Sequence, residues 1–263
     1  MATTAAVELE VRDGVAHVTL NRPDDANGID ADLARDLLAA TVAIEADPSV
    51  RTVLLSGRGA RFCGGGDVKS FAAAGDDLTA LVRSLLPSLH TAISMLVRGD
   101  APVVAAVHGC AAGAGLGLVC ASDLVIAGES TKFVMAYTAV GLTPDGSSSW
   151  FLPRIVGLKR ALELTLTNRV LSAAEALDLG IVTRVMPDAE VHTEAEQLAQ
   201  QLASGPTLAL GTAKRLLHTS LEDTFETHLA READGIVRAT TTHDGREGVT
   251  AFAEKRAPEF RGK

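Results

Sequence analysis

Two glycine-rich loops are the parts of this sequence best suited to chemistry. Phe62–Asp67 reads FCGGGD and Gly109–Gly115 reads GCAAGAG, and each follows a predicted buried strand and precedes a predicted helix. Glycine lets a backbone approach a ligand closely, and the N–H groups that begin a helix lack partners within it. Two such N–H groups converging on one oxygen would form an oxyanion hole. Simple close packing would produce the same pattern, and neither loop has a dinucleotide or P-loop fingerprint.

Three side chains outside these loops could move protons. Asp145 lies between a proline and a glycine, a context typical of a turn or a helix cap. His90 lies on a predicted helix, where a lone histidine is more often a surface or packed residue. Tyr137 could belong to the core or line a pocket beside Asp145, and its ordinary pKa of about 10 makes it a poor base at neutral pH. The residue types alone leave structural and catalytic interpretations open.

The elements that must position these residues follow from the hydrophobic pattern. Apolar alternation and short apolar runs predict strands, a 3.6-residue period predicts helices, and Asp30 and Asp67 are placed to cap helices. The predicted strands are Val7–Val11, Val15–Leu20, Arg51–Ser56, Pro102–Val107, Leu124–Ala127, Lys132–Val134 and Val182–Val185. The predicted helices are Asp30–Ala46, Leu78–Arg98 (with a kink or restart at Pro87), a helix ending near Ser122, Leu158–Thr167, Ser172–Leu179, Ala189–Ala203, Pro206–Thr219, Leu221–Thr240 and Asp244–Lys255. We therefore expect an α/β core followed by a helical C-terminal region.

Composition argues against several classes of function. The 263 residues carry a formal net charge of −9 and no run of Lys or Arg, so we expect no nucleic-acid partner. The longest apolar candidate, Ala101–Val107, is far shorter than the ~20 residues that cross a membrane, and Met1–Thr4 lacks the basic start of a secretory signal. Cys63, Cys110 and Cys120 show no metal-ligand spacing. We expect reduced thiols, no metal site, no membrane partner and a cytoplasmic location.

Five motifs in the same order resemble the crotonase, or enoyl-CoA hydratase/isomerase, superfamily over essentially the full chain. Val18–Pro23 is similar to the family's opening strand and turn, and Phe62–Lys69 to its first oxyanion loop. Pro102–Asp123 resembles its signature segment, and Leu152–Gly157 and Gly245–Phe252 match later family stretches. The resemblance implies the crotonase (ClpP/crotonase) fold, an α/β spiral of ββα units with a helical C-terminal region.

The resemblance also implies a domain organisation and a substrate class. Residues 1–200 would form the spiral core with an acyl-CoA site, and residues 201–263 a helical region that builds homotrimers, often hexamers made as dimers of trimers. The family acts on acyl-coenzyme A thioesters, in which coenzyme A is part of the substrate. We expect no further cofactor.

The family motifs place an oxyanion hole on two residues of this chain. The resemblance assigns one donor to the Gly66 N–H and the other to the Ala114 N–H, at the centre of the second glycine-rich triplet. Alanine keeps its N–H, so the second donor survives in this chain. The residues that the resemblance places along the acyl-CoA channel are Ala26, Gly64, Gly66, Asp67, Val68, Lys69, Gly113 and Ala114.

The chain departs from the family at the two positions that handle water in the hydratases. Those enzymes carry a glutamate at each, whereas this chain has Gly117 and Tyr137, which puts the two-glutamate hydration mechanism in doubt. Gly141–Gly146 instead resembles ring 1,2-epoxyphenylacetyl-CoA isomerases and one branch of Δ3,Δ2-enoyl-CoA isomerases, which carry a carboxylate at the Asp145 position as a proton shuttle. A 4-chlorobenzoyl-CoA dehalogenase is also similar, with a nucleophilic aspartate there and a histidine where His90 falls.

These observations lead to three functional hypotheses. The first is an acyl-CoA isomerase in which Gly66 and Ala114 hold the thioester oxygen and Asp145 moves a proton between two carbons. The second is an enoyl-CoA hydratase, or a dehalogenase or thioesterase with Asp145 as nucleophile and His90 as base. Seven Phe, one Tyr and one Trp argue mildly against a benzoyl substrate. The third is a non-catalytic relative that binds acyl-CoA or RNA, which Asp145 and the intact loops oppose.

Overall fold

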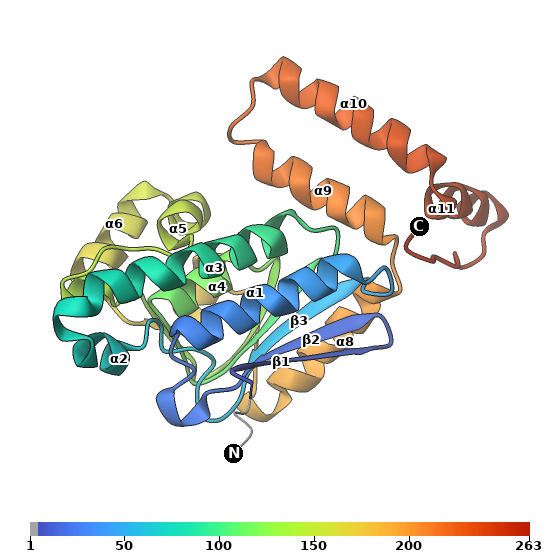
Figure 1. The fold of residues 1–263 in the computed structure, drawn as a ribbon. Coiled ribbons are helices and arrows are strands. Elements are labelled where there is room, and N and C mark those ends of the chain that lie inside the picture. The colour runs from blue at the N-terminus through green and yellow to red at the C-terminus, as the bar shows by residue number, and fades with distance from the viewer. Residues whose placement is uncertain (1–4) are drawn as a thin grey trace.

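Two sheets form the core of the protein, and helices cover both faces of the larger one (Figure 1). The computed structural model describes residues 5–263. Met1–Thr4, on which the expectation about a secretory signal rests, lies outside the described residues. Strands and helices alternate through the first part of the chain and only helices follow Met186. The predicted α/β core with a helical C-terminal region is confirmed.

The larger sheet has the strand order β1-β2-β3-β4-β6-β9. β1 and β2 form the predicted antiparallel hairpin, in which the turn residues Asp13 and Gly14 both have positive φ (50° and 78°), as a two-residue hairpin turn requires. Every further pair in this sheet is parallel. The strands are β1 (Val7–Arg12), β2 (Val15–Leu20), β3 (Thr52–Gly57), β4 (Val103–Val107), β6 (Leu124–Gly128) and β9 (Arg184–Met186). β9 begins later than predicted, because Val182 is buried in the preceding loop and not in the strand.

The smaller sheet contains β5 (Cys110–Ala112), β7 (Lys132–Val134) and β8 (Leu171–Ser172). Only β7 was predicted: β5 lies within the stretch interpreted as the second glycine-rich loop, and β8 has only two residues. β5 lies beside the first glycine-rich loop: the Cys63 N–H donates to the Cys110 carbonyl at 3.2 Å, and the Ala112 N–H donates to the Cys63 carbonyl at 3.0 Å. This pairing brings the two glycine-rich loops together.

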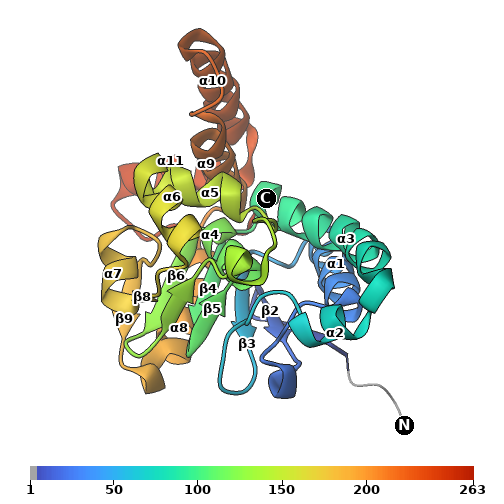
Figure 2. The same ribbon diagram turned by 90° about the vertical axis from the view of Figure 1, so that its left-hand side faces the viewer.

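Helices sandwich the larger sheet (Figures 1 and 2). α1 (Ala31–Ala46) and α3 (Leu78–Arg98) lie side by side on one face, and α8 (Val191–Ala203) packs on the other. Successive strand residues alternate between the two layers: Leu55 belongs to the core under α1 and α3, and Leu54 to the core under α8. Two hydrophobic layers therefore fix the sheet whose strand ends carry the glycine-rich loops.

Side-chain caps begin α1 and α2 as predicted. Asp30 accepts a hydrogen bond from the Leu33 N–H at 2.8 Å, and Asp67 accepts one from the Ser70 N–H at 3.1 Å. α3 runs through Pro87 as one helix, so the chain does not restart there. The remaining helices of the core are α2 (Val68–Ala73), α4 (Ala114–Ala121), α5 (Ser148–Val156), α6 (Leu158–Thr167) and α7 (Ala173–Asp178), with short 3-10 turns η1 (Pro23–Asp25), η2 (Gly75–Asp77), η3 (Tyr137–Val140) and η4 (Asp188–Glu190). α5 was not predicted.

One segment, Gly75–Arg98, is long and apolar enough to cross a membrane by length and composition, within residues 5–263. The expectation that no segment approaches this length is therefore wrong on those two criteria. α3 makes up most of the segment and packs against α1. It buries one helical stripe in the core, formed by Leu85, Leu89, Ala92, Ile93 and Leu96. A core helix of a globular fold meets the same two criteria.

Three C-terminal helices extend beyond the core (Figure 1). They are α9 (Thr207–Thr219), α10 (Phe225–Thr241) and α11 (His243–Glu254). Buried Lys214 attaches α9 to the core, because its Nζ lies 2.7 Å from Asp123 Oδ2 and donates to the Leu96 carbonyl at 2.7 Å. α10 begins four residues later than predicted, since Thr224 caps its first turn. The division between residues 200 and 201 falls inside α8 and stays a prediction.

Candidate active site

The two glycine-rich loops meet at the start of α4. Gly65 has a φ of 93°, and a Cβ there would lie 2.8 Å from the Ala112 carbonyl oxygen, so only glycine permits this approach. Ala114 is the first residue of α4, where an N–H has no acceptor within the helix. In the described part of the chain, neither the Gly66 N–H nor the Ala114 N–H donates a hydrogen bond. Both donors are therefore available to a ligand oxygen.

Gly66 and Ala114 line a cavity of about 240 Å³. Its walls are mainly apolar side chains, namely Ile29, Val68, Phe71, Val82, Leu85, Leu86, Leu89, Val140 and Leu142, and Gly64, Gly65, Gly113, Ala136 and Thr143 complete it. Tyr137 and Asp145 are the only titratable side chains among the described residues that line it. The cavity thus combines two backbone donors, an apolar surface and one carboxylate.

The segment Arg22–Asp30 holds the first glycine-rich loop in place. The Ile29 N–H donates to the Gly65 carbonyl at 2.7 Å, and the Asp67 N–H donates to the Ile29 carbonyl at 3.0 Å. These two hydrogen bonds lie on either side of Gly66. They fix the peptide that carries the Gly66 N–H without using that N–H.

Asn27 is a residue of this region that sequence reasoning missed. It is fully buried, and its amide nitrogen donates to the carbonyl oxygens of Arg58, Arg61 and Phe62 at 2.9, 2.8 and 3.0 Å. The side chain therefore ties the Arg22–Asp30 segment to the loop after β3. Its only signal in the sequence is an asparagine before a glycine, which reads as an ordinary turn.

Asp67 faces an ion cluster and not the cavity. Arg22 Nη2 lies 2.9 Å from Asp67 Oδ2, and two further carboxylates lie within 3.3 Å of the same nitrogen. Burial alone would raise the pKa of the Asp67 carboxyl, but hydrogen bonds from the Ser70 N–H and hydroxyl and from Arg22 outweigh it and lower that pKa. The Lys69 side chain is exposed. Asp67 and Lys69 sit beside the loop without lining the cavity.

The residues expected along the acyl-CoA channel therefore divide into two groups. Gly64, Gly66, Val68, Gly113 and Ala114 line the cavity, whereas Ala26, Asp67 and Lys69 do not. The Ala26 carbonyl accepts a hydrogen bond from the Gly64 N–H at 2.8 Å. Contact of these residues with coenzyme A stays a prediction.

Asp145, Tyr137 and His90 come together at the edge of the cavity. The Tyr137 hydroxyl donates to the Asp145 backbone carbonyl at 3.1 Å, and the Ser148 hydroxyl donates to the same oxygen at 2.7 Å. Burial, reinforced by the charge of Asp145, raises the pKa of Tyr137, so the phenol keeps its proton at neutral pH. His90 Nε2 lies 3.7 Å from Asp145 Oδ2. Among the described residues that line the cavity, Asp145 is thus the one that carries a carboxylate.

The turn that carries Asp145 fills the space beside Gly117. A Cβ on Gly117 would lie 2.4 Å from the Gly146 carbonyl oxygen, which is too close for any side chain. The turn itself depends on positive φ at Gly146 and Ser147 (54° and 68°). With the turn in this position, a glutamate cannot occupy residue 117.

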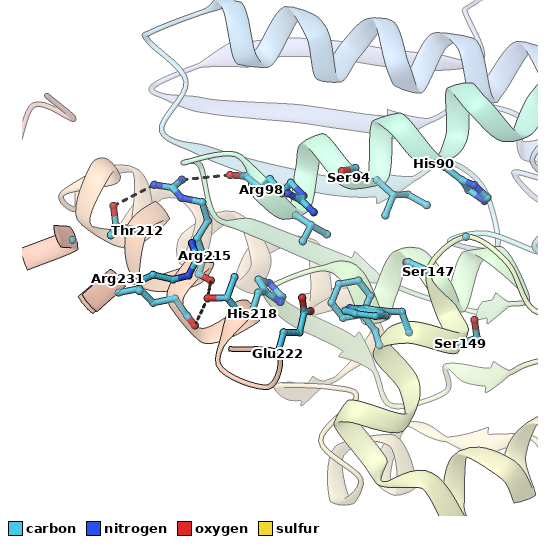
Figure 3. A pocket seen from close by; sticks show the side chains of 18 of the residues that line it. His90, Ser94, Arg98, Ser147, Ser149, Thr212, Arg215, His218, Glu222 and Arg231 are labelled. Atoms are coloured by element: carbon cyan, nitrogen blue, oxygen red, sulfur yellow. Dashed lines mark hydrogen bonds between the residues drawn. The ribbon is translucent and has the colours of Figure 1, made fainter. Parts of the chain in front are cut away.

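A larger cleft of about 990 Å³ lies next to the cavity, between α3, α5, α9 and α10 (Figure 3). Figure 3 shows His90 and Ser94 on α3 opposite Ser147 and Ser149 at the start of α5. Asp145 lines both the cavity and the cleft, whereas His90 lines the cleft alone. The Asp145 carboxylate therefore stands between the two spaces.

Comparison with known proteins decides the family. The enoyl-CoA hydratase/isomerase family model matches residues 10–263. The chain belongs to the enoyl-CoA hydratase/isomerase family. The structure is similar to that of an enoyl-CoA hydratase from Polaromonas sp. JS666, with a TM-score of 0.92 and 34% sequence identity. The match covers 97% of this chain and 99% of that chain. The predicted crotonase fold is confirmed.

Relatives within the family carry different reaction names. The chain is 39% identical to a 1,2-epoxyphenylacetyl-CoA isomerase of Escherichia coli K12, over 96% of this chain and 97% of the relative. It is 34% identical to 4-chlorobenzoyl coenzyme A dehalogenase-2 of an Arthrobacter species, over 98% of this chain and 91% of the relative. The protein is thus an acyl-CoA enzyme by family, and these names leave its reaction step open.

Proposed function

We propose that this protein is an acyl-CoA isomerase, in which the Gly66 and Ala114 N–H groups bind the thioester oxygen and Asp145 moves a proton between two carbons of the acyl chain. The observation that carries the proposal is that Asp145 supplies the one carboxylate, within residues 5–263, in a cavity with two free backbone donors. The apolar walls suit an aliphatic acyl chain. Tyr137 supports the reaction by fixing the Asp145 backbone.

The proposed reaction has two proton transfers. Asp145 removes a proton from the acyl chain, and the negative charge moves to the thioester oxygen, where each backbone donor stabilises it by on the order of 3–4 kcal/mol. Asp145 then returns a proton to a different carbon, which shifts the double bond. Proton transfer by a positioned carboxylate typically contributes ~10²–10⁴-fold in rate. These steps need no metal and no redox cofactor.

A second candidate is hydrolysis through a covalent adduct on Asp145, which is an acyl adduct in a thioesterase and an aryl ester that keeps the thioester in a dehalogenase. The short distance between His90 and Asp145 favours it, because a histidine beside a nucleophilic aspartate could activate the water that releases the adduct. The similarity to a 4-chlorobenzoyl coenzyme A dehalogenase points the same way. A hydratase is less well supported, since residue 117 has no room for a carboxylate.

A panel of thioesters separates these candidates. We would incubate the protein with 3-hexenoyl-CoA, 2-hexenoyl-CoA and 4-chlorobenzoyl-CoA, and follow mass and absorbance. Isomerisation leaves the mass unchanged and creates the absorbance of a conjugated enoyl thioester, and hydration adds one water. Thioester hydrolysis releases free coenzyme A, whereas dehalogenation replaces chlorine by hydroxyl, releases chloride and keeps the thioester. Turnover of none of them, despite binding, would support the non-catalytic alternative and reject the proposal.

We also propose that the protein assembles as a homotrimer or hexamer. The C-terminal helices expose Leu217, Leu221, Phe225, Ile236, Val249 and Phe252, and a different surface on α6 and α7 exposes Leu158, Leu162, Leu166, Val170 and Leu177. Large exposed apolar patches mark interaction surfaces, and contact between two different patches of identical chains generates a ring where the rotation between neighbours closes. Sedimentation at micromolar concentration tests the proposal, and a monomer there would contradict it. The cytoplasmic location stays a prediction.

A further inference from the structure

We infer that His90 is a proton relay that connects Asp145 to the outer cleft, so that the proton taken from the substrate exchanges with solvent during turnover. The inference rests on the proposed function only in requiring Asp145 to remove a proton from an acyl-CoA. It differs from a role for His90 as a base inside the acyl cavity. The position of His90 on α3 carries the argument.

α3 runs past both spaces in turn. Side chains spaced three and four residues apart lie on one face of a helix. The first part of this face lines the acyl cavity with Val82, Leu85, Leu86 and Leu89, and its continuation lines the outer cleft with His90, Ile93, Ser94 and Val97. His90 therefore lies where α3 passes from the cavity to the cleft. Its imidazole is about half exposed and does not reach the acyl cavity.

Asp145 is the point where a proton can pass between these spaces. Inside the cavity Tyr137 cannot take a proton from Asp145, because burial raises the pKa of the phenol and keeps it protonated. The Asp145 side chain is itself 30% exposed and lines the cleft, so a proton on it can leave directly to water or through a neighbouring base. His90 Nε2, 3.7 Å from Asp145 Oδ2, offers the alternative route. The other imidazole that lines the cleft, His218, lies 3.8 Å from Asp123 Oδ1.

The relay balances without a co-reactant. The C–H bond of the substrate breaks, its electron pair enters the enolate, and the proton forms an O–H bond on Asp145. That proton then passes to Nε2 of His90 when rotation of the half-exposed imidazole closes the 3.7 Å gap between the two groups, and a proton leaves from Nδ1 to water. The reverse sequence protonates Asp145 from solvent before the second carbon receives its proton. Asp145 remains the group that acts on the substrate.

Isotope exchange tests the relay directly. We would convert 3-hexenoyl-CoA in D₂O with the wild-type protein, His90→Gln and the matched control His218→Gln, and measure deuterium in the product by mass spectrometry. We expect most wild-type and His218→Gln product molecules to carry solvent deuterium. In His90→Gln, the fraction of product that carries deuterium should fall at least fivefold. The isomerisation rate should fall by less than tenfold, because Asp145 still transfers the substrate proton directly. Equal deuterium incorporation in His90→Gln and the wild type would overturn the relay.

A second substrate separates the relay from the proposed function. Saturated hexanoyl-CoA cannot isomerise, but its proton next to the thioester exchanges in D₂O if Asp145 forms the enolate. If hexanoyl-CoA exchanges in the wild type and exchanges more slowly in His90→Gln, the relay is supported. This holds even if 3-hexenoyl-CoA is not isomerised, in which case only the isomerase proposal is rejected. Exchange that is the same in both proteins rejects the relay. Absence of both exchange and isomerisation in the wild type rejects both. His90→Asn provides a second variant if the glutamine variant does not fold.

Discussion

Gly117 and Gly146 are so close that the first can carry no side chain while the second stays in place: a Cβ on Gly117 would lie 2.4 Å from the Gly146 carbonyl oxygen. Gly146 directly follows Asp145 in a turn. The Tyr137 and Ser148 hydroxyls both donate to the backbone carbonyl of Asp145 and so hold this turn. By the family resemblance, Gly117 is also a position at which hydratases carry a glutamate. Within this backbone, a glutamate at residue 117 and the Asp145 turn exclude each other, which accords with the proposed role of Asp145 as proton acceptor.

The first prediction concerns the variant Gly117→Ala. One methyl group must displace the Gly146 carbonyl and with it Asp145, and a shift of about 1 Å at a reacting group can cost roughly 10²-fold in rate. We expect the variant to bind acyl-CoA, because Gly66 and Ala114 are unchanged, and to isomerise at least tenfold more slowly. Isothermal titration and initial rates measure the two effects. Gly248→Ala, which adds a methyl on α11 near the Phe260 ring, is the control. Undiminished turnover in Gly117→Ala would contradict the mutual exclusion.

Local signals in the sequence predict the parts of the fold that depend on neighbouring residues. The Asp13–Gly14 hairpin turn and the caps at Asp30 and Asp67 all form as expected, because each needs only residues within a few positions. The family motifs likewise identify Gly66 and Ala114, which the structure places on one cavity.

Long-range packing determines what the sequence could not predict. His90 lies 3.7 Å from Asp145 only because the tertiary fold brings together two residues that are 55 positions apart in the chain. The reason for glycine at residue 117 is the carbonyl of Gly146, which no local pattern reveals. Asn27 reads as a turn residue until its three carbonyl partners are known. Each depends on tertiary contacts between segments distant in sequence.

The second prediction concerns Asn27→Ala. This change removes three donated hydrogen bonds from a fully buried amide, and buried polar groups left without partners cost about 1–3 kcal/mol each. We expect the free energy of unfolding to fall by at least ~2 kcal/mol in urea denaturation. Any folded variant should lose turnover more than acyl-CoA binding, because the loop that carries Gly66 loosens. Asn21→Ala, at a more exposed amide, is the control. If Asn27→Ala and Asn21→Ala had the same free energy of unfolding, the Asn27 amide would not be what holds the loop.

The third prediction concerns the oxyanion donors. Ala114→Pro removes one N–H at the first position of α4, where proline is best tolerated in a helix, and loss of one such donor costs ~10²–10³ in turnover. We expect kcat to fall by this amount with little change in the affinity for acyl-CoA. Ala31→Pro makes the same substitution at the exposed first position of α1 and should leave kcat unchanged. Normal turnover in folded Ala114→Pro would exclude Ala114 as a donor; Gly66→Pro tests the other donor in the same way.

The last prediction concerns Asp145→Asn, which keeps the size of the side chain but cannot accept a proton. The Gly66 and Ala114 donors remain, so acyl-CoA should still bind, and isomerisation should fall by ~10²–10⁴, the usual contribution of a general base. Asp32→Asn, at an exposed carboxylate on α1, controls for the loss of a negative charge. Rapid quench of the wild-type protein followed by mass spectrometry then separates the two roles of Asp145. A shuttling carboxylate leaves the protein mass unchanged, whereas a nucleophilic one adds the mass of the acyl group. Full activity in Asp145→Asn would reject both roles, because each of them requires the Asp145 carboxylate itself.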